Sequence, residues 1–202
     1  MKNVNENVSV AKPVKASAFR TIDIAYIAMA VALMAVCSWI CIPTAAVSFT
    51  LQTFAVFLTC YLLGGWRGTT AVVVYILLGA AGVPVFAEMS GGISSLAGAS
   101  GGYIIGFFFS ALVMWAFERF IGKKFWMYAI SMVLALAVCY AFGTAWFVRV
   151  FVTEDGSKVG TMAALGWCVF PFIIPDLAKI ALALAIGSNK ALRRSIRNGE
   201  TA

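Results

Sequence analysis

Residues 125–147, FWMYAISMVLALAVCYAFGTAWF, contain no charged side chain. A helix needs about 20 apolar residues to cross roughly 30 Å of hydrocarbon. Comparable apolar blocks, separated by short polar or glycine-rich stretches, occupy residues 24–42, 50–65, 69–83 and 103–117. Across the 202 residues 62% are apolar and 11% are charged, whereas a soluble domain is roughly half apolar and a quarter charged. We therefore predict an all-α integral membrane protein.

A sixth apolar block, 172–187, is irregular because a proline, an aspartate and a lysine interrupt it. The segment 84–102 is rich in glycine, a composition typical of a loop rather than a helix. The stretch 159–169 is apolar but too short to span a bilayer. These patterns predict a bundle of six transmembrane helices.

Basic residues lie beside the ends of these blocks, and their distribution predicts the orientation of the chain in the membrane. With six helices the two termini share a side with the turns at 66–68 and 118–124, and that side carries most of the Lys and Arg residues. The opposite side holds only Arg149 and Lys158. By the positive-inside rule both termini are cytoplasmic. The predicted parts are a cytoplasmic N-terminal segment (1–21), a six-helix membrane domain (22–190) and a basic cytoplasmic tail (191–202).

The composition argues against several classes of function. A net charge of +7 would suggest a nucleic-acid partner in a soluble protein, but here the basic residues are placed as topology signals. The chain has no histidine and no C-x-x-C pair, which leaves few ligands for a metal. It also lacks a phosphate-loop motif and the H-E-x-x-H and G-x-S-x-G motifs. We expect no catalytic residue, metal, cofactor or nucleic-acid partner, and a protein that is not an enzyme.

Two charged residues, Asp176 and Lys179, lie inside the last apolar block and share a helix face at i,i+3. A charge at the centre of a membrane helix costs about 2.5 to 3.5 kcal/mol on insertion scales. Pro175 suits the first turn of a helix and Asp176 the positive end of its dipole, whereas Lys179 opposes that dipole. The two charges can be a structural pair that neutralises itself. We favour a functional site, because in lipid the pair needs further polar partners, which an anionic substrate would supply.

Other polar side chains collect at the predicted outward ends of the helices. Thr50 and Gln52 open the second block, Glu88 and Ser90 lie in the glycine-rich segment, and Tyr103 begins the fourth block. Glycines would let this segment fold over a ligand with its backbone N–H groups exposed. A mobile solvated linker would explain the same composition equally well.

The first block carries a stripe of small residues, namely Ala25, Ala28, Ala32 and Ala35. Such stripes allow close approach of helices, either inside a bundle or with another membrane protein. The sequence does not distinguish these two arrangements, and we favour a partner protein.

Several motifs occur in order along most of the chain. They are IP at 42–43 with TLQTFAV at 50–56, LLGGWRG at 62–68, LGAAGVPVFA at 78–87, SGG at 90–92, GGYIIGF at 101–107 and PFIIPDLAK at 171–179. Together they resemble the BioY-type biotin-binding S components of energy-coupling factor (ECF) transporters. The resemblance implies a six-helix, multi-pass protein of the bacterial cell membrane with an outward-facing pocket for biotin as transported substrate.

The resemblance also implies which residues bind the substrate. Asp176 and Lys179 match the binding pair of the family. Lys179 could neutralise the biotin carboxylate, while Asp176 and Gln52 suit the ureido ring, and which end of biotin meets which residue stays open. Val47 and Phe49 would cover the apolar parts. The full set of candidate residues is Phe49, Thr50, Gln52, Glu88, Ser90, Gly91, Tyr103, Asp176 and Lys179.

The chain departs from the family pattern at two positions of interest. Pro175 stands where the family often has glycine, and Glu88 where a neutral amide or a small residue is expected. An ionised Glu88 could accept hydrogen bonds from the ureido N–H groups but would repel a nearby carboxylate.

The resemblance also implies a protein partner besides membrane lipid and biotin. Transport in this family is driven by a separate module that consists of two ATPases and a transmembrane coupling protein. The resemblance implies that Ala28 and Ala32 belong to the surface that docks on this module.

Two rival functions remain open from the sequence. One is a stand-alone secondary transporter of another small organic anion, which would use Asp176 and Lys179 as a substrate or proton relay. The other is a small membrane enzyme acting on lipid, against which the missing histidine counts.

Overall fold

The computed structural model describes residues 21–43, 47–153 and 156–189. Its described part is mainly helical, which confirms the all-α prediction; the β-structure is one antiparallel hairpin with strands of two residues and an isolated bridge between Val152 and Lys158. The α-helices are α1 (Thr21–Trp39), α2 (Gln52–Leu63), α3 (Gly65–Ala80), α4 (Ile93–Ala97), α5 (Gly101–Phe120), α6 (Phe125–Val150), α7 (Thr161–Cys168) and α8 (Phe170–Gly187). The remaining elements are β1 (Cys41–Ile42), β2 (Phe49–Thr50) and the 3₁₀ helix η1 (Ala87–Met89).

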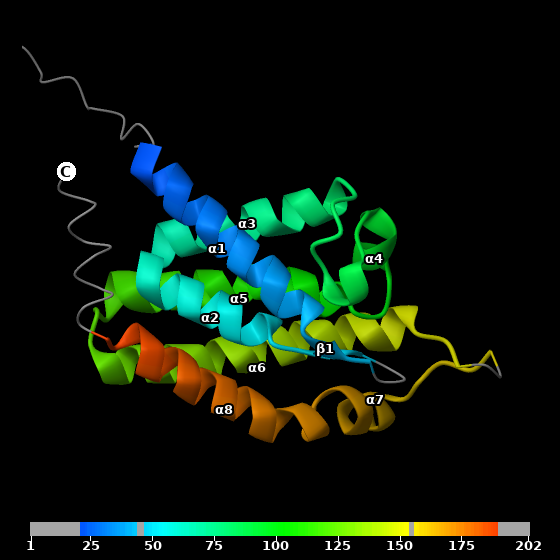
Figure 1. The fold of residues 1–202 in the computed structure, drawn as a ribbon. Coiled ribbons are helices and arrows are strands. Elements are labelled where there is room, and N and C mark those ends of the chain that lie inside the picture. Colours follow the sequence, from blue (N-terminus) through cyan, green and yellow to red (C-terminus); the bar gives the residue numbers. More distant parts are fainter. Residues whose placement is uncertain (1–20, 44–46, 154–155, 190–202) are drawn as a thin grey trace, which may run out of the picture.

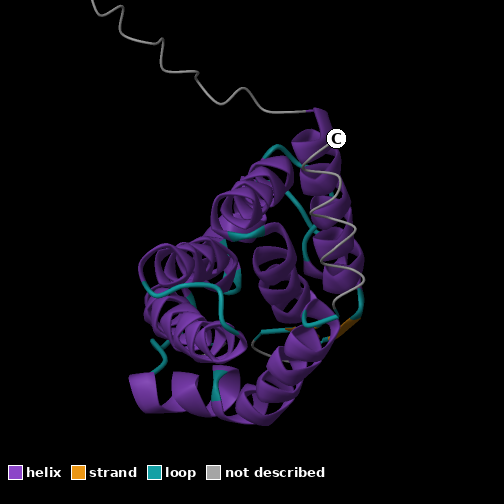
Figure 2. Cartoon of the chain, turned by 90° about the vertical axis from the view of Figure 1, so that its left-hand side faces the viewer, coloured by secondary structure: helices purple, strands orange, loops and turns teal. Residues whose placement is uncertain are grey.

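The six predicted membrane helices correspond to α1, α2, α3, α5, α6 and α8. Figure 1 shows α5 and α6 side by side, with α1 crossing the bundle obliquely, and Figure 2 views α5 and α6 nearly end-on. By length and composition, α1, α5, α6 and α8 can each cross a membrane, whereas α2 is apolar but has only 12 residues. The count of six spans and the cytoplasmic termini therefore stay predictions. The basic tail and residues 1–20 of the N-terminal segment lie outside the described residues.

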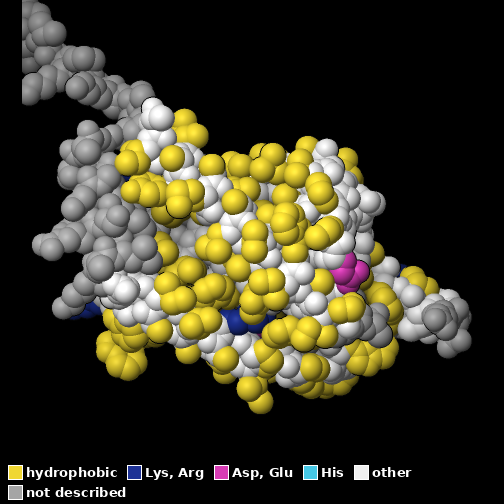
Figure 3. All heavy atoms as spheres, in the orientation of Figure 1, with side chains coloured by type: hydrophobic (Ala, Val, Ile, Leu, Met, Phe, Trp, Pro, Cys, Tyr) yellow, Lys and Arg dark blue, Asp and Glu magenta, His cyan; other side chains and the backbone are white. Residues whose placement is uncertain are grey.

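The outer surface of the bundle is apolar. Figure 3 shows hydrophobic side chains over most of the face in view. Large side chains such as Met29 on α1, Trp126 on α6 and Ile174 on α8 are 68%, 73% and 79% exposed. Exposed apolar surface on this scale marks contact with lipid or protein rather than water. The fold therefore agrees with a multi-pass membrane protein.

The glycine-rich segment 84–102 is not the plain loop that its composition predicts. It contains η1 and the five-residue helix α4, and α5 begins inside it at Gly101. Gly92 has a φ of 91°, and its N–H donates to the carbonyl of Gly79 over 2.7 Å, which ties the segment back to α3. A left-handed turn of this kind needs glycine. The helices between such turns are too short to show a hydrophobic period.

The start of α8 also differs from the expectation. The helix begins at Phe170, so Pro171 lies in its first turn and Pro175 lies inside the helix. Proline has no backbone N–H, which costs nothing in the first turn of a helix. Pro171 therefore suits the start of α8 better than Pro175 does. Asp176 consequently stands in the second turn of α8, further from the positive end of the dipole than the sequence suggested.

Candidate ligand-binding pocket

A cavity of about 210 Å³ opens between the β1–β2 hairpin, η1, α2, α5, α6 and α8. Pockets for drug-sized ligands measure about 300–1,000 Å³, so this cavity suits a compact molecule. Buried apolar side chains form much of its wall. The lining residues are Val47, Ser48, Thr50, Gln52, Thr53, Phe86, Ala87, Glu88, Ser90, Ala99, Ser100, Tyr103, Ile104, Phe107, Leu136, Cys139, Tyr140, Cys168, Phe172, Asp176 and Lys179.

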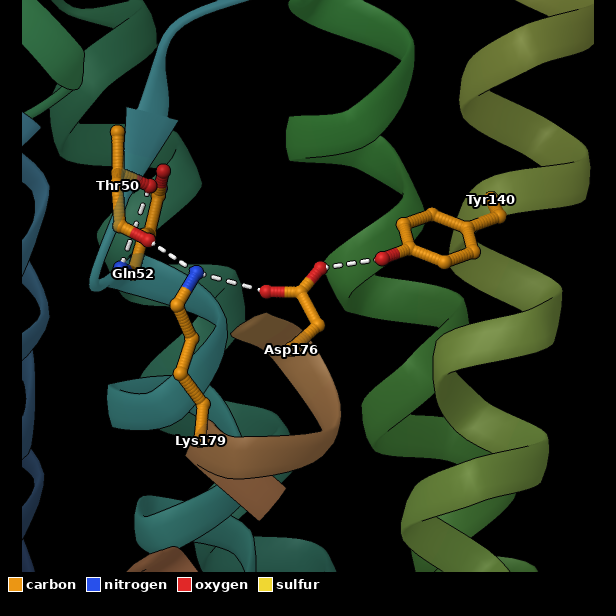
Figure 4. Close-up of polar contacts among 5 residues, drawn as sticks. All are labelled: Thr50, Gln52, Tyr140, Asp176 and Lys179. Atoms are coloured by element: carbon orange, nitrogen blue, oxygen red, sulfur yellow. Dashed lines mark hydrogen bonds and ion pairs between the residues drawn. The ribbon is translucent and has the colours of Figure 1, made fainter. Parts of the chain in front are cut away.

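A buried ion pair forms the floor of the cavity. Asp176 and Lys179 on α8 are 3% and 5% exposed, and Lys179 Nζ donates to Asp176 Oδ1 over 2.7 Å. Lys179 Nζ also donates to the backbone carbonyl of Thr50 over 2.5 Å (Figure 4). The ammonium lies 4.0 Å from the centroid of the Phe49 ring, which is cation–π distance. These close partners offset part of the cost of burying the two charges.

Tyr140 on α6 holds the other oxygen of the carboxylate. Its hydroxyl donates to Asp176 Oδ2 over 2.5 Å, so Asp176 joins α8 to α6 (Figure 4). Sequence reasoning missed this residue. The available signal was a phenol hydroxyl in the middle of an apolar helix, since a buried tyrosine hydroxyl usually finds a hydrogen-bond partner.

A second chain of hydrogen bonds fixes Gln52 at the start of α2. The Gln52 side-chain amide donates to the hydroxyl of Tyr75 over 2.7 Å, and Tyr75 donates to the carbonyl of Val85 over 2.7 Å. The same carbonyl accepts from the hydroxyl of Ser38 over 2.5 Å. One N–H of the Gln52 amide is thus used within the protein, and the amide oxygen is an acceptor that Gln52 can offer to a ligand.

Glu88 lies at the rim of the cavity and is exposed, whereas the other lining residues are buried or half-buried. The hydroxyl of Ser48 donates to its carboxylate, which joins η1 to the loop before β2. Glu88 and the adjacent Met89 have φ angles of 56° and 54°, in the left-handed region that residues other than glycine rarely adopt. We identify this rim as the mouth of the cavity.

The structure brings most of the predicted binding residues to one cavity. Phe49 is not among the lining residues, although its ring contacts Lys179. Gly91 does not line the cavity either: a Cβ added there would lie 2.4 Å from the carbonyl oxygen of Val83, so Gly91 serves a close backbone approach. Of the predicted set, Thr50, Gln52, Glu88, Ser90, Tyr103, Asp176 and Lys179 line the cavity.

The small-residue stripe of α1 divides into two parts. Ala25, Ala28 and Ala32 are exposed, whereas Ala35 is 6% exposed and belongs to the core. Ala28 and Ala32 therefore do not pack inside the described bundle, and of the two arrangements left open by the sequence this favours contact with another membrane component.

Comparison with known proteins gives consistent matches. Residues 9–197 match the BioY family. A protein of Thermotoga maritima named "Biotin transporter BioY" is 43% identical over 157 residues, which is 77% of this chain and 87% of that protein. A "Probable biotin transporter BioY" of Pyrococcus horikoshii is 35% identical, over 81% of this chain and 93% of that protein.

One solved structure shares the fold. The crystal structure of the S-component for biotin from an ECF-type ABC transporter superposes with a TM-score of 0.72 at 22% sequence identity. The superposition covers 87% of this chain and 90% of the other. The similarity extends over nearly the whole bundle rather than over one pair of helices.

Proposed function

Because the chain belongs to the BioY family, we propose that it is a biotin-binding S component, a multi-pass membrane subunit through which biotin is taken up. The observation that carries this proposal is the cavity with the buried Asp176–Lys179 pair at its floor. Charged residues inside a membrane protein often mark the pathway of a substrate. Burying such charges costs free energy, so they are rare where they have no function.

The chemistry of the cavity suits biotin. Biotin presents a ureido group with two N–H donors and one carbonyl acceptor, an apolar thiophane ring and a carboxylate tail. Asp176 and Gln52 supply acceptors, Lys179 supplies a donor, and apolar side chains such as Phe86 and Phe172 supply the walls. A mostly apolar pocket with a few convergent polar groups is the usual form of a small-molecule site.

The energy for uptake is proposed to come from a separate module of two ATPases and a transmembrane coupling protein. The exposed Ala28 and Ala32 of α1 would let a helix of the coupling protein approach closely. In the same proposal the bundle crosses the membrane six times with both termini in the cytoplasm, and the mouth of the cavity faces outward.

The test is calorimetry on the purified chain in neutral detergent, with biotin as ligand and riboflavin and thiamine as controls. We expect tight binding of biotin alone, lost in Lys179→Ala and kept in Lys158→Ala, which removes an exposed lysine away from the cavity. Equal unfolding temperatures would show that the variants fold. If biotin does not bind the wild type, the assignment is wrong and the secondary transporter of another anion becomes the better reading.

A further inference from the structure

The floor of the cavity is electrically neutral. The positive charge of Lys179 is neutralised by Asp176, whose Oδ1 lies 2.7 Å from Nζ. No other lining residue in the described part of the chain is a lysine or arginine. A ligand carboxylate seated there would place a second anion beside Asp176 with one ammonium between them. Two carboxylates that share a site in low dielectric repel each other strongly. The floor is therefore a poor seat for the anionic end of a ligand.

The hydrogen-bonding groups of the floor match a urea instead. Lys179 Nζ has three donors, of which one points to Asp176 and one to the carbonyl of Thr50. Figure 4 places the ammonium between Asp176 on one side and Thr50 with Gln52 on the other. The lining thus supplies one donor group, the ammonium of Lys179, and two acceptor groups, the carboxylate of Asp176 and the side-chain amide of Gln52. A ureido group presents the complement, N–H, C=O and N–H.

The mouth of the cavity carries a net negative charge and also disfavours an anion. Glu88 is an exposed acid on η1, held in position by Ser48. A carboxylate tail that leaves through the mouth would meet a like charge. A neutral amide tail would meet no repulsion, and a cationic tail would be attracted.

We propose that the chain binds biotin with its ureido ring on the floor and its tail beside Glu88, and that its substrates include biotin amides with neutral or cationic tails. The chemical class is that of biotin conjugated through its carboxyl group to an amine. Glu88 is then the residue that discriminates tail charge, which gives a function to the departure of this position from the family pattern. The inference rests on the proposed biotin site and extends its substrate range.

The test compares biotin with its primary carboxamide, which differs in tail charge and hardly in size, by calorimetry on the full chain in neutral detergent. Two unit charges about 7 Å apart in water-like surroundings change affinity roughly threefold. We expect the wild type to bind the amide about threefold more tightly than biotin at low salt. In Glu88→Gln the ratio should fall to about one, and in the wild type it should shrink at high salt, because screening acts on exposed charges.

A matched pair of variants separates charge from loop structure. Aspartate and asparagine are equal in size and both tolerate the left-handed backbone of position 88. Glu88→Asp should keep the preference for the amide, and Glu88→Asn should lose it. A merely structural role of Glu88 would change both variants alike and would leave the salt dependence unaltered, and that result would overturn its assigned role.

Failure of this inference differs from failure of the biotin assignment. If biotin binds but its amide binds tenfold or more weakly, the carboxylate sits on the floor and the proposed orientation is wrong. If neither ligand binds the wild type, the biotin site itself is wrong.

Discussion

The carboxylate of Asp176 connects the two sides of the cavity. Its Oδ1 accepts from Lys179 on the same helix, and its Oδ2 accepts from Tyr140 across the gap to α6. Both oxygens are positioned before a ligand arrives. Groups held in place in advance lose less entropy on binding and thus contribute more to affinity.

Removing the hydroxyl of Tyr140 tests this arrangement. Hydrogen bonds to a charged group contribute about 1.5 to 3 kcal/mol, so Tyr140→Phe should weaken biotin binding by a factor of at least ten while leaving the aromatic ring in place. Tyr26→Phe on α1, outside the lining of the cavity, is the matched control. Calorimetry gives both affinities. Wild-type affinity in Tyr140→Phe would mean that Lys179 alone positions Asp176.

The site was predictable in part from single residues. Asp176 and Lys179 stand out because charges are rare within apolar runs, and the cost of burying them is independent of the details of the fold. Tyr140 does not stand out, since tyrosine is amphipathic and its partner depends on how α6 packs on α8. The same holds for Gln52, whose amide is oriented by Tyr75 of the neighbouring α3.

Among the described helices, α5 and α6 share the most extensive contact, and a glycine allows their close approach next to the cavity. A Cβ added to Gly143 on α6 would lie 2.2 Å from Cδ1 of the Tyr103 ring on α5. Tyr103 lines the cavity, and its hydroxyl lies 3.2 Å from the hydroxyl of Thr144. The wall of the cavity is thus set by a contact that no larger residue allows.

Gly143→Ala should therefore disturb both folding and binding. Overpacking a well-packed interior typically costs about 1 to 3 kcal/mol, so we expect a lower unfolding temperature in detergent and weaker biotin binding as Tyr103 is displaced. Gly166→Ala on α7 is the control, because a Cβ there meets nothing within 4 Å. If the two variants unfold at the same temperature, Tyr103 moves aside without cost and the close contact does not limit the packing.

The exposed face of α1 supports a different experiment. Ala28→Leu should weaken association with the proposed energy module, because a larger side chain prevents close approach of two helices. Biotin affinity should be unchanged, since Ala28 lies on the outer surface, away from the cavity. Copurification with the module and calorimetry measure the two effects. Ala137→Leu, at an exposed position of α6, controls for added bulk in the bilayer.

Helix boundaries were less predictable than helix identity. The apolar blocks of the sequence correspond to α1, α2, α3, α5, α6 and α8, of which α1, α5, α6 and α8 have the length that a membrane span requires. The helices α4 and α7 have five and eight residues, and their existence depends on turns such as that at Gly92. The start of α8 depended on which of two prolines opens the helix, and the local sequence allowed both.

At the scale of the whole molecule, the class of protein follows from composition, and the distribution of charge predicts an orientation. An apolar fraction of 62% leaves no room for a water-facing surface of ordinary polarity. The basic residues are concentrated on one predicted side, and this asymmetry predicts the topology before any packing is known. The shape of the cavity could not be predicted in this way, because it is formed by segments distant in sequence, from Val47 to Lys179.

The topology itself can be measured with two single cysteines. Lys123 lies in the turn between α5 and α6, and Lys158 lies beyond the other end of α6, so one crossing separates them. In intact cells a membrane-impermeant thiol reagent should label Lys158→Cys but not Lys123→Cys, and permeabilised cells should show labelling of both. Of the five native cysteines only Cys41 is half-buried rather than buried, so Cys41→Ser is the suitable background.

Each alternative result has a distinct meaning. Labelling of Lys123→Cys alone in intact cells would reverse the orientation and place the mouth of the cavity toward the cytoplasm, which is incompatible with uptake from outside. Labelling of both positions in intact cells would mean that α6 does not cross the membrane, although its 26 residues and high hydropathy suffice for a span. The expected pattern requires that the mouth beside Glu88 faces outward, where it can receive its substrate.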